Sequence, residues 1–458
     1  MEPLTLTEIA AAVNGRLTGD SSINITGVRT DSRLAAPGEL FVPLKAARDG
    51  HAFIGAAFEK GAACALSEID IAAAKPVIRV QSTAQALLDL AEYYAARFPI
   101  PKIAVTGSAG KTTVKDMAAA ALSQKYRTLK SEGNFNNEIG VPLTIFNLDS
   151  SYECAVFEMG MNHYGELARM SRAVRPDACV ITNIGVAHIE NFGSREGILK
   201  AKSEIFAYMK PGGTAVLNGD DDMLNTLTGL QNPLWYWIEN EAPQIREKAR
   251  GVWASDVRDG GLGGLACTVH YKDASFDLRI RTPGRHMVFN ALAAAAVGFS
   301  MGLSPEQIRA GIEGCAPSAA RMDVAVTPGG ITVIDDSYNA NPVSMKSALD
   351  VLARAQGRRI CVLGDMLELG DFSDEMHFYI GQYAAEKALD CAVFIGGKSE
   401  YAYDAYAAAR PEGNALYFPF KEGLYDCLAK VVKSGDTVLV KASHGMKFAE
   451  IVERIKLM

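Results

Sequence analysis

The sequence lacks the features that mark a secreted or membrane-embedded protein. Its first residues, "MEPLTLTEIAAAVNGRL", do not show the basic-then-apolar order of a signal peptide. Even the apolar stretch "ALAAAAVGFSMGL" is too short to cross a bilayer, which takes about 20 residues. We therefore expect a cytoplasmic protein with no membrane span.

The sequence also lacks any C-x-x-C pair, although it contains eight cysteines. These cysteines lie far apart, mostly inside apolar runs such as "ACVIT" and "RRICVLG". Zinc sites depend on closely spaced cysteines, and disulfides are rare in reducing compartments. The pattern favours free, buried thiols.

Positive charge is not in excess, since the formal net charge is -7. This balance argues against non-specific binding to nucleic acid, although a local basic pocket could still hold an anionic metabolite. No low-complexity tract or internal repeat is present, and the composition is that of an ordinary globular protein. At 458 residues the chain is too long for one core, and its length predicts roughly three domains.

The order of strand-like and helical segments predicts an α/β protein of three domains. Residues 1–81 read as a small mixed α/β domain. Residues 82–316 alternate strands and helices, which predicts a central P-loop ATPase domain with a mostly parallel sheet, and segment 260–281 reads as antiparallel strands. Residues 317–458 predict a Rossmann-like, doubly wound C-terminal domain. Ligands should lie at the carboxyl ends of the strands, in a cleft between the two larger sheets.

The stretch "KIAVTGSAGKTTVKDM" has the form of a phosphate-binding loop. An apolar strand leads into small residues and glycines before a helix opens, so backbone N–H groups converge on an anion. The strict pattern requires glycine where Val105 stands, so this loop is a shorter variant. We expect the Lys111 ammonium to contact the β- and γ-phosphates and the Thr112 hydroxyl to bind Mg²⁺. The other residues expected at the phosphates are Gly107, Ser108, Ala109, Gly110 and Thr113.

Polar residues follow several strands, and each has a structural and a functional interpretation. Glu158 ends the strand "AVFEMG", where it could bind Mg²⁺ or simply cap the strand, and its position favours neither. His188 also follows a strand, but a lone histidine is more often a structural residue than a ligand. For Lys202, in "GILKAKSEIF", the sequence alone favours a solvated helix face shared with Lys200.

Three further stretches carry polar residues with two interpretations. In "TPGRHMVFNALAA", His286 and Asn290 could meet a purine or cap the helix that follows. In "VIDDSYNANPVSM", turn chemistry explains the asparagines and the proline but does not require two adjacent acids. A ribose or metal contact is therefore as consistent as a plain turn. "VLGDMLELGDFS" has the same strand-then-acid form, with Asp365 and Glu368.

Together these stretches resemble the Mur ligases, the ATP-dependent amide-forming enzymes of bacterial cell-wall precursor synthesis. The resemblance rests on "TDSR", "TGSAGKTT", "NFNNEIGVPLT", "NIGVAHIENFGS", "AKSEIF", "DDSYNANP" and "LGDMLELG", which cover all three expected domains in order. Within the family, the chain looks like the branch that adds D-alanyl-D-alanine to UDP-N-acetylmuramoyl-tripeptide. The resemblance implies that ATP converts the tripeptide's terminal carboxylate to an acyl phosphate, which the dipeptide's amine then attacks. From the net charge we expect no nucleic-acid partner, and we also expect a monomer.

The resemblance assigns roles to individual residues. It makes Lys111, Glu158, His188 and Lys202 the catalytic set. It implies two Mg²⁺ ions, with Thr112, Glu158 and His188 as ligands and with Lys202 carbamylated to hold the second ion. The residues it places at ATP, besides the loop, are His286, Asn290, Arg321 and Asp336. Those it places at the UDP end and the middle of the nucleotide substrate are Asp31, Ser32, Arg33, Lys45, Asn136 and Asn137, and those at the dipeptide are Tyr338, Asn339 and Asn341.

Two other functions compete with this one. A folylpolyglutamate-synthase-like or sister amide ligase shares the fold and the acyl-phosphate chemistry, but the separate N-terminal domain with "TDSR" disfavours the former. A nucleotide switch, in which hydrolysis alters partner affinity, leaves the N-terminal domain and the acids of the third domain without a task. Substrate-independent ATP hydrolysis would support the switch.

Overall fold

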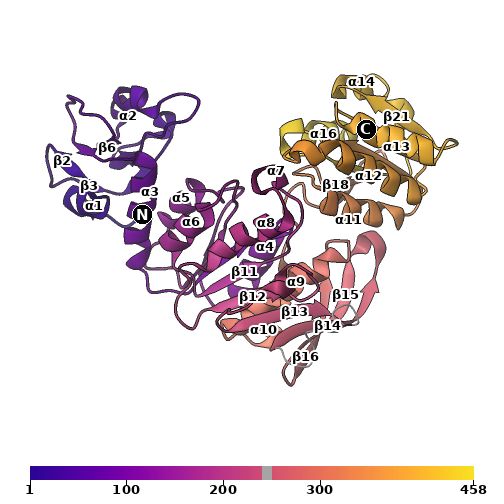
Figure 1. Cartoon of the computed structure of the whole chain (residues 1–458), viewed down its shortest axis with the longest axis horizontal. Helices are drawn as coiled ribbons and strands as arrows, with labels where there is room; N and C mark the ends of the chain where they lie inside the picture. The colour runs from indigo at the N-terminus through magenta and orange to yellow at the C-terminus, as the bar shows by residue number, and fades with distance from the viewer. Residues whose placement is uncertain (240–249) are drawn as a thin grey trace. The chain divides into compact units, whose positions relative to one another are not determined.

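The computed structural model describes residues 1–239 and 250–458, and it confirms an α/β protein built mainly on parallel sheets (Figure 1). The chain packs into two compact units. The first contains residues 1–106, 125–180 and 201–215, and the second contains residues 107–124, 181–200 and 216–458. None of the described helices combines the length and the apolar character that a bilayer span requires. All eight cysteines are free thiols, as expected, and six of them are buried.

The amino-terminal part of the first unit is built around a five-stranded sheet. Its strands, in spatial order, are β2 (Arg16–Thr18), β7 (Val77–Arg79), β6 (Cys64–Ser67), β5 (Glu39–Phe41) and β4 (Gly27–Arg29). Strands β4 to β7 run parallel, and β2 pairs antiparallel with β7 at the edge. The inner strands β5 and β6 are buried at every residue, as parallel strands usually are. The other elements here are β1 (Leu4–Thr5), β3 (Asn24–Ile25), α1 (Leu6–Ala12), η1 (Ser32–Leu34), η2 (Gly50–Phe53) and α2 (Ile54–Lys60).

The middle of the sequence forms a nine-stranded sheet. Its strands, in spatial order, are β16 (Ala274–Ile280), β15 (Leu265–Tyr271), β14 (Gly251–Asp259), β13 (Pro233–Ile238), β12 (Thr214–Asn218), β11 (Ala178–Ile181), β8 (Lys102–Thr106), β10 (Cys154–Glu158) and β9 (Thr128–Lys130). Strands β8 and β10 are parallel and buried throughout. Strands β14, β15 and β16 pair antiparallel, which confirms the expectation for residues 260–281.

The helices of this middle part begin at recognisable signals. Helix α10 starts with Pro305 after a capping box between Ser304 and Gln307. Helix α3 starts after Ser82, whose side chain caps it by accepting a hydrogen bond from Gln85 N. The helices are α3 (Thr83–Ala96), α4 (Lys111–Leu122), α5 (Gly140–Ile145), α6 (Glu166–Val174), α7 (Ile189–Phe192), α8 (Arg195–Ser203), α9 (His286–Ser300) and α10 (Pro305–Gly314), with the 3₁₀ turns η3 (Glu204–Phe206), η4 (Leu224–Thr226) and η5 (Gly261–Gly263).

The carboxyl-terminal part of the second unit has a six-stranded sheet. Its strands, in spatial order, are β17 (Asp323–Val326), β18 (Thr332–Asp335), β22 (Asp436–Lys441), β19 (Arg358–Gly364), β20 (Cys391–Ile395) and β21 (Ala415–Phe418). All pairs are parallel except β17 with β18. The helices are α11 (Pro342–Ala353), α12 (Ser373–Glu386), α13 (Ser399–Ala409), α14 (Lys421–Tyr425), α15 (Leu428–Val431) and α16 (Ala449–Lys456), with η6 (Gly370–Phe372) and η7 (His444–Met446). The alternation of strand and helix matches the expected doubly wound pattern.

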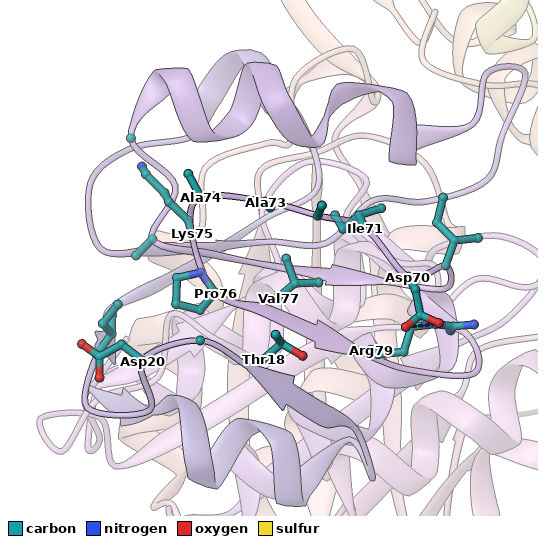
Figure 2. Close-up of a pocket in the computed structure, with 16 residues that line it drawn as sticks. Thr18, Asp20, Asp70, Ile71, Ala73, Ala74, Lys75, Pro76, Val77 and Arg79 are labelled. Carbon is teal, nitrogen blue, oxygen red and sulfur yellow. Dashed lines mark ion pairs between the residues drawn. The ribbon is translucent and has the colours of Figure 1, made fainter.

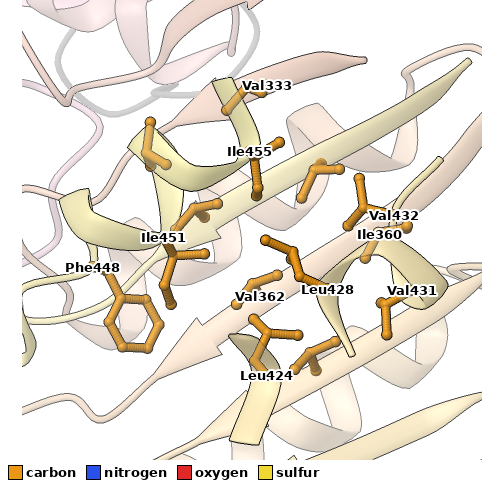
Figure 3. Close-up of a cluster of buried hydrophobic side chains, with 14 of the residues drawn as sticks. Val333, Ile360, Val362, Leu424, Leu428, Val431, Val432, Phe448, Ile451 and Ile455 are labelled. Atoms are coloured by element: carbon orange, nitrogen blue, oxygen red, sulfur yellow. The ribbon is translucent and has the colours of Figure 1, made fainter. Parts of the chain in front are cut away.

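An apolar cluster packs three of these helices onto the sheet. Figure 3 shows Leu424, Phe448 and Ile451 with side chains of the strands, and all belong to one cluster of buried residues. Burying each such side chain contributes about 1.5–3 kcal/mol. The cluster fixes β22, whose carboxyl end carries residues used below.

Candidate active site

The loop after β8 needs glycine at two positions. Gly107 has a φ of +149° and Gly110 a φ of +82°. A Cβ atom on Gly107 would lie 1.8 Å from Thr182 Oγ1, and one on Gly110 would lie 2.6 Å from Asn290 Oδ1. Because other residues avoid this backbone region and the space is filled, only glycine fits at either position.

The loop backbone is held by the segment that follows β11. Ser108 N donates to Asn183 O at 3.0 Å, and Ala109 N donates to Asn183 Oδ1 at 2.9 Å. Thr182 Oγ1 and Asn183 Nδ2 both donate to Ala109 O, at 2.5 and 3.0 Å. Gly185 N donates to Ser108 Oγ at 2.9 Å. The loop is therefore preorganised, so binding an anion requires little further ordering.

The start of α4 can hold a phosphate group. The helix begins at Lys111 directly after Gly110, so the positive end of its dipole lies at the loop and favours an anion there. Lys111 Nζ donates to Gly107 O at 2.8 Å, which keeps the ammonium at the loop. Thr112 is buried and Thr113 is half-buried in the same turn. Converging N–H groups and an ammonium are the donors that phosphate binding needs.

Asn290 lies against this loop. It is buried on α9, and its side-chain oxygen is the atom that a Cβ on Gly110 would strike. Its Nδ2 donates to Met287 Sδ at 3.4 Å. The structure thus brings Asn290 to the phosphate loop.

Glu158 is a buried carboxylate with one unused oxygen. It ends β10 and lies opposite Val105 of β8, two residues before Gly107. Its Oε1 accepts from Asn136 Nδ2 at 2.8 Å, whereas its buried Oε2 has no hydrogen-bond partner in the part of the chain that is described. An unpaired buried carboxylate oxygen costs free energy. A hard cation such as Mg²⁺ would satisfy it.

Magnesium fits this donor chemistry better than a soft metal does. In residues 1–239 and 250–458, no three His, Cys, Asp or Glu side chains form a group that could hold a metal ion. Magnesium usually keeps several waters and takes only one or two carboxylates together with phosphate oxygens. The unpaired, buried oxygen of Glu158 suits such a ligand set, to which the protein contributes few groups.

His188 pairs with an acid that the sequence analysis mentioned but gave no role. Its Nδ1 lies 2.9 Å from Glu368 Oε2. Both residues have positive φ, +62° for His188 and +65° for Glu368, and such strain clusters at functional sites. His188 lowers the pKa of Glu368, and the charge of Lys111 lowers it further. Glu368 therefore belongs to the electrostatic surroundings of the phosphate loop.

Lys202 lies in the interior, which the sequence alone did not predict. It is 1% exposed, as is expected of a residue one turn after the buried Ile198 on the same face of α8. Lys200 is exposed. The interpretation of both lysines as a solvated helix face is therefore wrong for Lys202. Its carbamylation stays a prediction.

Arg321 stacks on Tyr338. The guanidinium carbon lies 3.9 Å from the ring centroid, and Tyr338 N donates to Ala320 O at 3.1 Å. The residues on both sides of Arg321 have positive φ, +56° at Ala320 and +52° at Met322. The cation is thus held over an aromatic face by a strained turn.

Both carboxylate oxygens of Asp336 already have protein partners. Oδ1 accepts from Met322 N at 3.1 Å, and Oδ2 pairs with Lys441 Nζ. Lys441 Nζ also donates to the backbone oxygen of the exposed Asn339, at 2.9 Å. Sequence reasoning missed Lys441, because it ends an apolar strand about one hundred residues away and no local pattern indicates this pairing.

His286 borders a small cavity and is neutral at neutral pH. The cavity, of about 110 Å³, is lined by residues that include Gly284, Asp350 and Arg354. Burial lowers the pKa of His286 to about 4, although the negative charge of Asp336 opposes the shift. A neutral imidazole can both donate and accept a hydrogen bond.

Two asparagines expected at substrates accept hydrogen bonds from backbone N–H groups near helix starts, and Asn341 is the N-cap of α11. Asn137 Oδ1 accepts from Ile139 N at 3.1 Å and from Gly140 N at 2.8 Å. Asn341 Oδ1 accepts from Ser344 N at 2.9 Å at the start of α11. Because these oxygens satisfy helix ends, substrate contacts through either residue would use the amide N–H groups.

The residues expected at the UDP end follow β4 and β5. Arg33 binds Asp31 through both carboxylate oxygens, at 2.6 to 3.2 Å, and holds the pKa of Asp31 at about 2. Ser32 begins η1 between them and is half-buried. Lys45 Nζ lies 2.5 Å from Glu68 Oε2. Because parallel strands end on one edge, β4 and β5 carry these residues to the same edge of the sheet.

A separate cavity lies between residues 69–76 and the same sheet (Figure 2). Its volume is about 640 Å³, and Asp20, Lys75 and the Asp70–Arg79 ion pair lie along it. Asp31, Ser32, Arg33 and Lys45 are not among its lining residues. This cavity is therefore distinct from the expected UDP-binding residues.

Two domain families match the sequence. The Mur ligase middle domain matches residues 105–298, and the Mur ligase, glutamate ligase domain matches residues 320–444. The first match contains the phosphate loop, Glu158, His188 and Asn290, and the second contains Arg321 and Asp336.

Full-length relatives and solved structures agree with these matches. The UDP-N-acetylmuramoyl-tripeptide–D-alanyl-D-alanine ligase of Bacillus subtilis (strain 168) is 35% identical over 98% of this chain and 97% of that protein. A crystal structure of MurF from Acinetobacter baumannii has a TM-score of 0.91 and 30% identity, and covers 100% of both chains. MurF ligase from Thermotoga maritima in complex with ADP has a TM-score of 0.83 and 27% identity, covering 94% of this chain and 97% of that one.

Proposed function

This chain belongs to the Mur ligase family, and we infer that it joins D-alanyl-D-alanine to UDP-N-acetylmuramoyl-tripeptide in peptidoglycan precursor synthesis. It is an ATP-dependent ligase that forms a C–N bond. The observation that carries this conclusion is the 35% identity to the Bacillus subtilis ligase over 98% of the chain. The ADP bound to the Thermotoga maritima relative supports the use of ATP.

The reaction activates a carboxylate before the amide forms. The tripeptide's terminal carboxylate attacks the γ-phosphate of ATP, and ADP leaves. The dipeptide's amine then attacks the carbonyl carbon of the acyl phosphate, and the tetrahedral intermediate collapses to the amide and inorganic phosphate. Such a sequence needs positioning and charge stabilisation, and no protein nucleophile.

The phosphate loop is assigned to the β- and γ-phosphates of ATP. Two observations support this assignment. Hydrogen bonds fix the backbone of residues 107–110, and Lys111 Nζ donates to the loop. Neutral His286 is assigned to the nucleotide base, with Asn290 nearby on the same helix. Arg321 and Asp336 are assigned to the phosphates and the ribose.

Magnesium is assigned to Thr112, Glu158 and His188, with Lys202 as a carbamate at a second ion. The buried, unpaired Oε2 of Glu158 supports the first assignment. A cation held by these residues would neutralise phosphate charge that otherwise repels the attacking carboxylate. The burial of Lys202 is compatible with the second assignment, because a carbamate changes the lysine from an ammonium into a metal-binding anion.

The remaining assignments concern substrates and organisation. Domain boundaries are proposed at 81/82 and 316/317, and these fall close to the start of α3 and after the end of α10. The chain is expected to act as a monomer, so light scattering should give a mass near 49.0 kDa.

The residues assigned to the nucleotide substrate are Asp31, Ser32, Arg33, Lys45, Asn136 and Asn137, and those assigned to the dipeptide are Tyr338, Asn339 and Asn341.

A phosphate-release assay tests the proposed function. The purified protein should release phosphate from ATP only when UDP-N-acetylmuramoyl-tripeptide and D-alanyl-D-alanine are both present. Equal turnover with a single amino acid in place of the dipeptide would favour a sister ligase. Release without either substrate would favour a nucleotide switch and contradict the proposal. Running the assay with meso-diaminopimelate or lysine as the third residue identifies the tripeptide.

A further inference from the structure

Lys441 is a buried lysine at the end of a central strand. It is 2% exposed, and β22 lies between β18 and β19, so its backbone is fixed on both sides. A buried ammonium is tolerated only where it is paired and hydrogen-bonded. The hydrogen-bond and ion-pair partners of Lys441 therefore indicate which segment it stabilises.

The Lys441 ammonium contacts one turn, residues 336–341. Nζ forms an ion pair with the carboxylate of Asp336 and lies 3.4 Å from the Asp336 backbone oxygen. It also donates to Asn339 O at 2.9 Å. An ammonium has three donors, so these contacts use its hydrogen-bonding capacity. Lys441 links the start of the turn to its middle and is not itself available to a substrate.

The residues after Lys441 hold the same turn. Ser443 Oγ donates to Ala340 O at 3.3 Å and accepts from Leu367 N at 2.9 Å. His444 N donates to Asn339 Oδ1 at 3.3 Å. The end of β22 is thus a rigid base beneath the turn.

The turn presents two side chains from this base. Asn339 is exposed, and Tyr338 is half-buried with its ring 5.3 Å from the ring of His444. A turn of this length that is not held from below loses conformational entropy whenever it binds a ligand. Anchoring by Lys441 removes part of that cost before the ligand arrives.

We propose that Lys441 is a positioning residue for the dipeptide acceptor, because it fixes the turn that presents Tyr338 and Asn339. The inference rests on the proposed function, which assigns this turn to D-alanyl-D-alanine. Lys441 also holds the carboxylate of Asp336, which is assigned to ATP. A weaker effect on ATP is therefore expected alongside the main effect on the dipeptide.

Steady-state kinetics of the full chain, with each substrate varied in turn, test the inference. For Lys441→Met, the KM for D-alanyl-D-alanine should rise at least about tenfold, and the KM for ATP should rise less. The KM for UDP-N-acetylmuramoyl-tripeptide should stay within about twofold of wild type. Lys430→Met removes an exposed lysine of the same sheet domain and should leave all three KM values unchanged.

Lys441→Arg covers the case in which Lys441→Met does not fold, because it keeps the charge that pairs with Asp336. Its planar fork cannot reproduce the donor geometry of an ammonium, so the dipeptide KM should still rise while the melting temperature stays near wild type. An unchanged dipeptide KM in the folded variants, or an equal rise in all three KM values, would overturn the inference. Failure of the proposed function would appear separately, as a wild-type enzyme that does not use D-alanyl-D-alanine.

Discussion

At the level of single residues, Gly110 combines a positive φ with a close neighbour. Gly110→Ala places a Cβ 2.6 Å from Asn290 Oδ1, so either the loop or the Asn290 side chain must shift. We expect the Kd for ATP to rise at least about tenfold, as measured by titration with a fluorescent ATP analogue.

Gly229→Ala is the matched control for Gly110→Ala. Gly229 has a φ of +73°, but no described atom lies within 4 Å of its added Cβ. The control keeps the backbone strain, about 1–2 kcal/mol, without the collision. Equal ATP affinities for the two variants would show that the contact with Asn290 does not matter.

Glu158 is the residue at which cation binding is most directly tested. Glu158→Gln keeps the shape but removes the charge, so the Mg²⁺ concentration for half-maximal phosphate release should rise. Because the variant also removes a buried charge with one unpaired oxygen, its melting temperature in EDTA should equal or exceed that of wild type. Glu153→Gln changes an exposed carboxylate and serves as the control. An unaltered Mg²⁺ dependence in Glu158→Gln would remove Glu158 from the metal site.

His286 makes stability depend on pH. Its pKa falls from 6.5 to about 4 on folding, so between these values the unfolded chain binds a proton that the folded chain does not. Stability is therefore lost as the pH falls from about 6.5 towards about 4. The charges that act on the ring are those of Asp336, Lys441 and Asp350. Melting temperatures should fall less steeply over this range in His286→Gln, and parallel curves would refute the assignment.

Several residues show where sequence reasoning reaches its limit. The conformation of the glycine-rich loop is predictable because its signal is local, since the glycines stand between a strand and a helix. The burial of Lys202 is not, because it depends on which face of α8 meets the rest of the protein. The role of Lys441 is not predictable either, because it depends on a tertiary contact with Asp336, which is 105 residues away. Asn341 has a correct local signal, but that signal does not distinguish a cap from a binding residue.

At the level of elements, α16 is held to the sheet by Phe448. This ring is fully buried, and a Cβ on Gly364 of β19 would lie 2.4 Å from its Cζ. Phe448→Ala should lower the free energy of unfolding by about 3–5 kcal/mol. Leu457→Ala, at a residue that is 88% exposed, should change it by less than about 0.5 kcal/mol. Urea unfolding of the full chain measures both, and similar values would argue against this packing.

The elements differ in how well the sequence predicts them. Strands such as β8 and β10 are buried at every residue, so they appear as continuous apolar runs. Short elements such as α7, with four residues, carry no periodic signal. The positions of such short elements depend on the loops around them. The sequence therefore predicted only that His188 follows a strand, and not that it precedes α7.

At the level of the whole molecule, the expected order of three domains stays a prediction, with which the family matches are compatible. The middle-domain match ends at residue 298 and the next begins at residue 320, on either side of the proposed boundary at 316/317. Strand and helix alternation predicts such an order, because each βαβ unit is recognisable by itself. The substrate is not predictable in this way, since the same fold serves sister ligases and only particular motifs distinguish them.

The central claim is that the γ-phosphate of ATP is transferred to the carboxylate of the tripeptide. The most direct test uses UDP-N-acetylmuramoyl-tripeptide labelled with ¹⁸O in both oxygens of that carboxylate. When D-alanyl-D-alanine is added with ATP, each phosphate released should carry one ¹⁸O, because the C–O bond to phosphate breaks as the amide forms. Label in AMP, or unlabelled phosphate together with the joined product, would contradict the account.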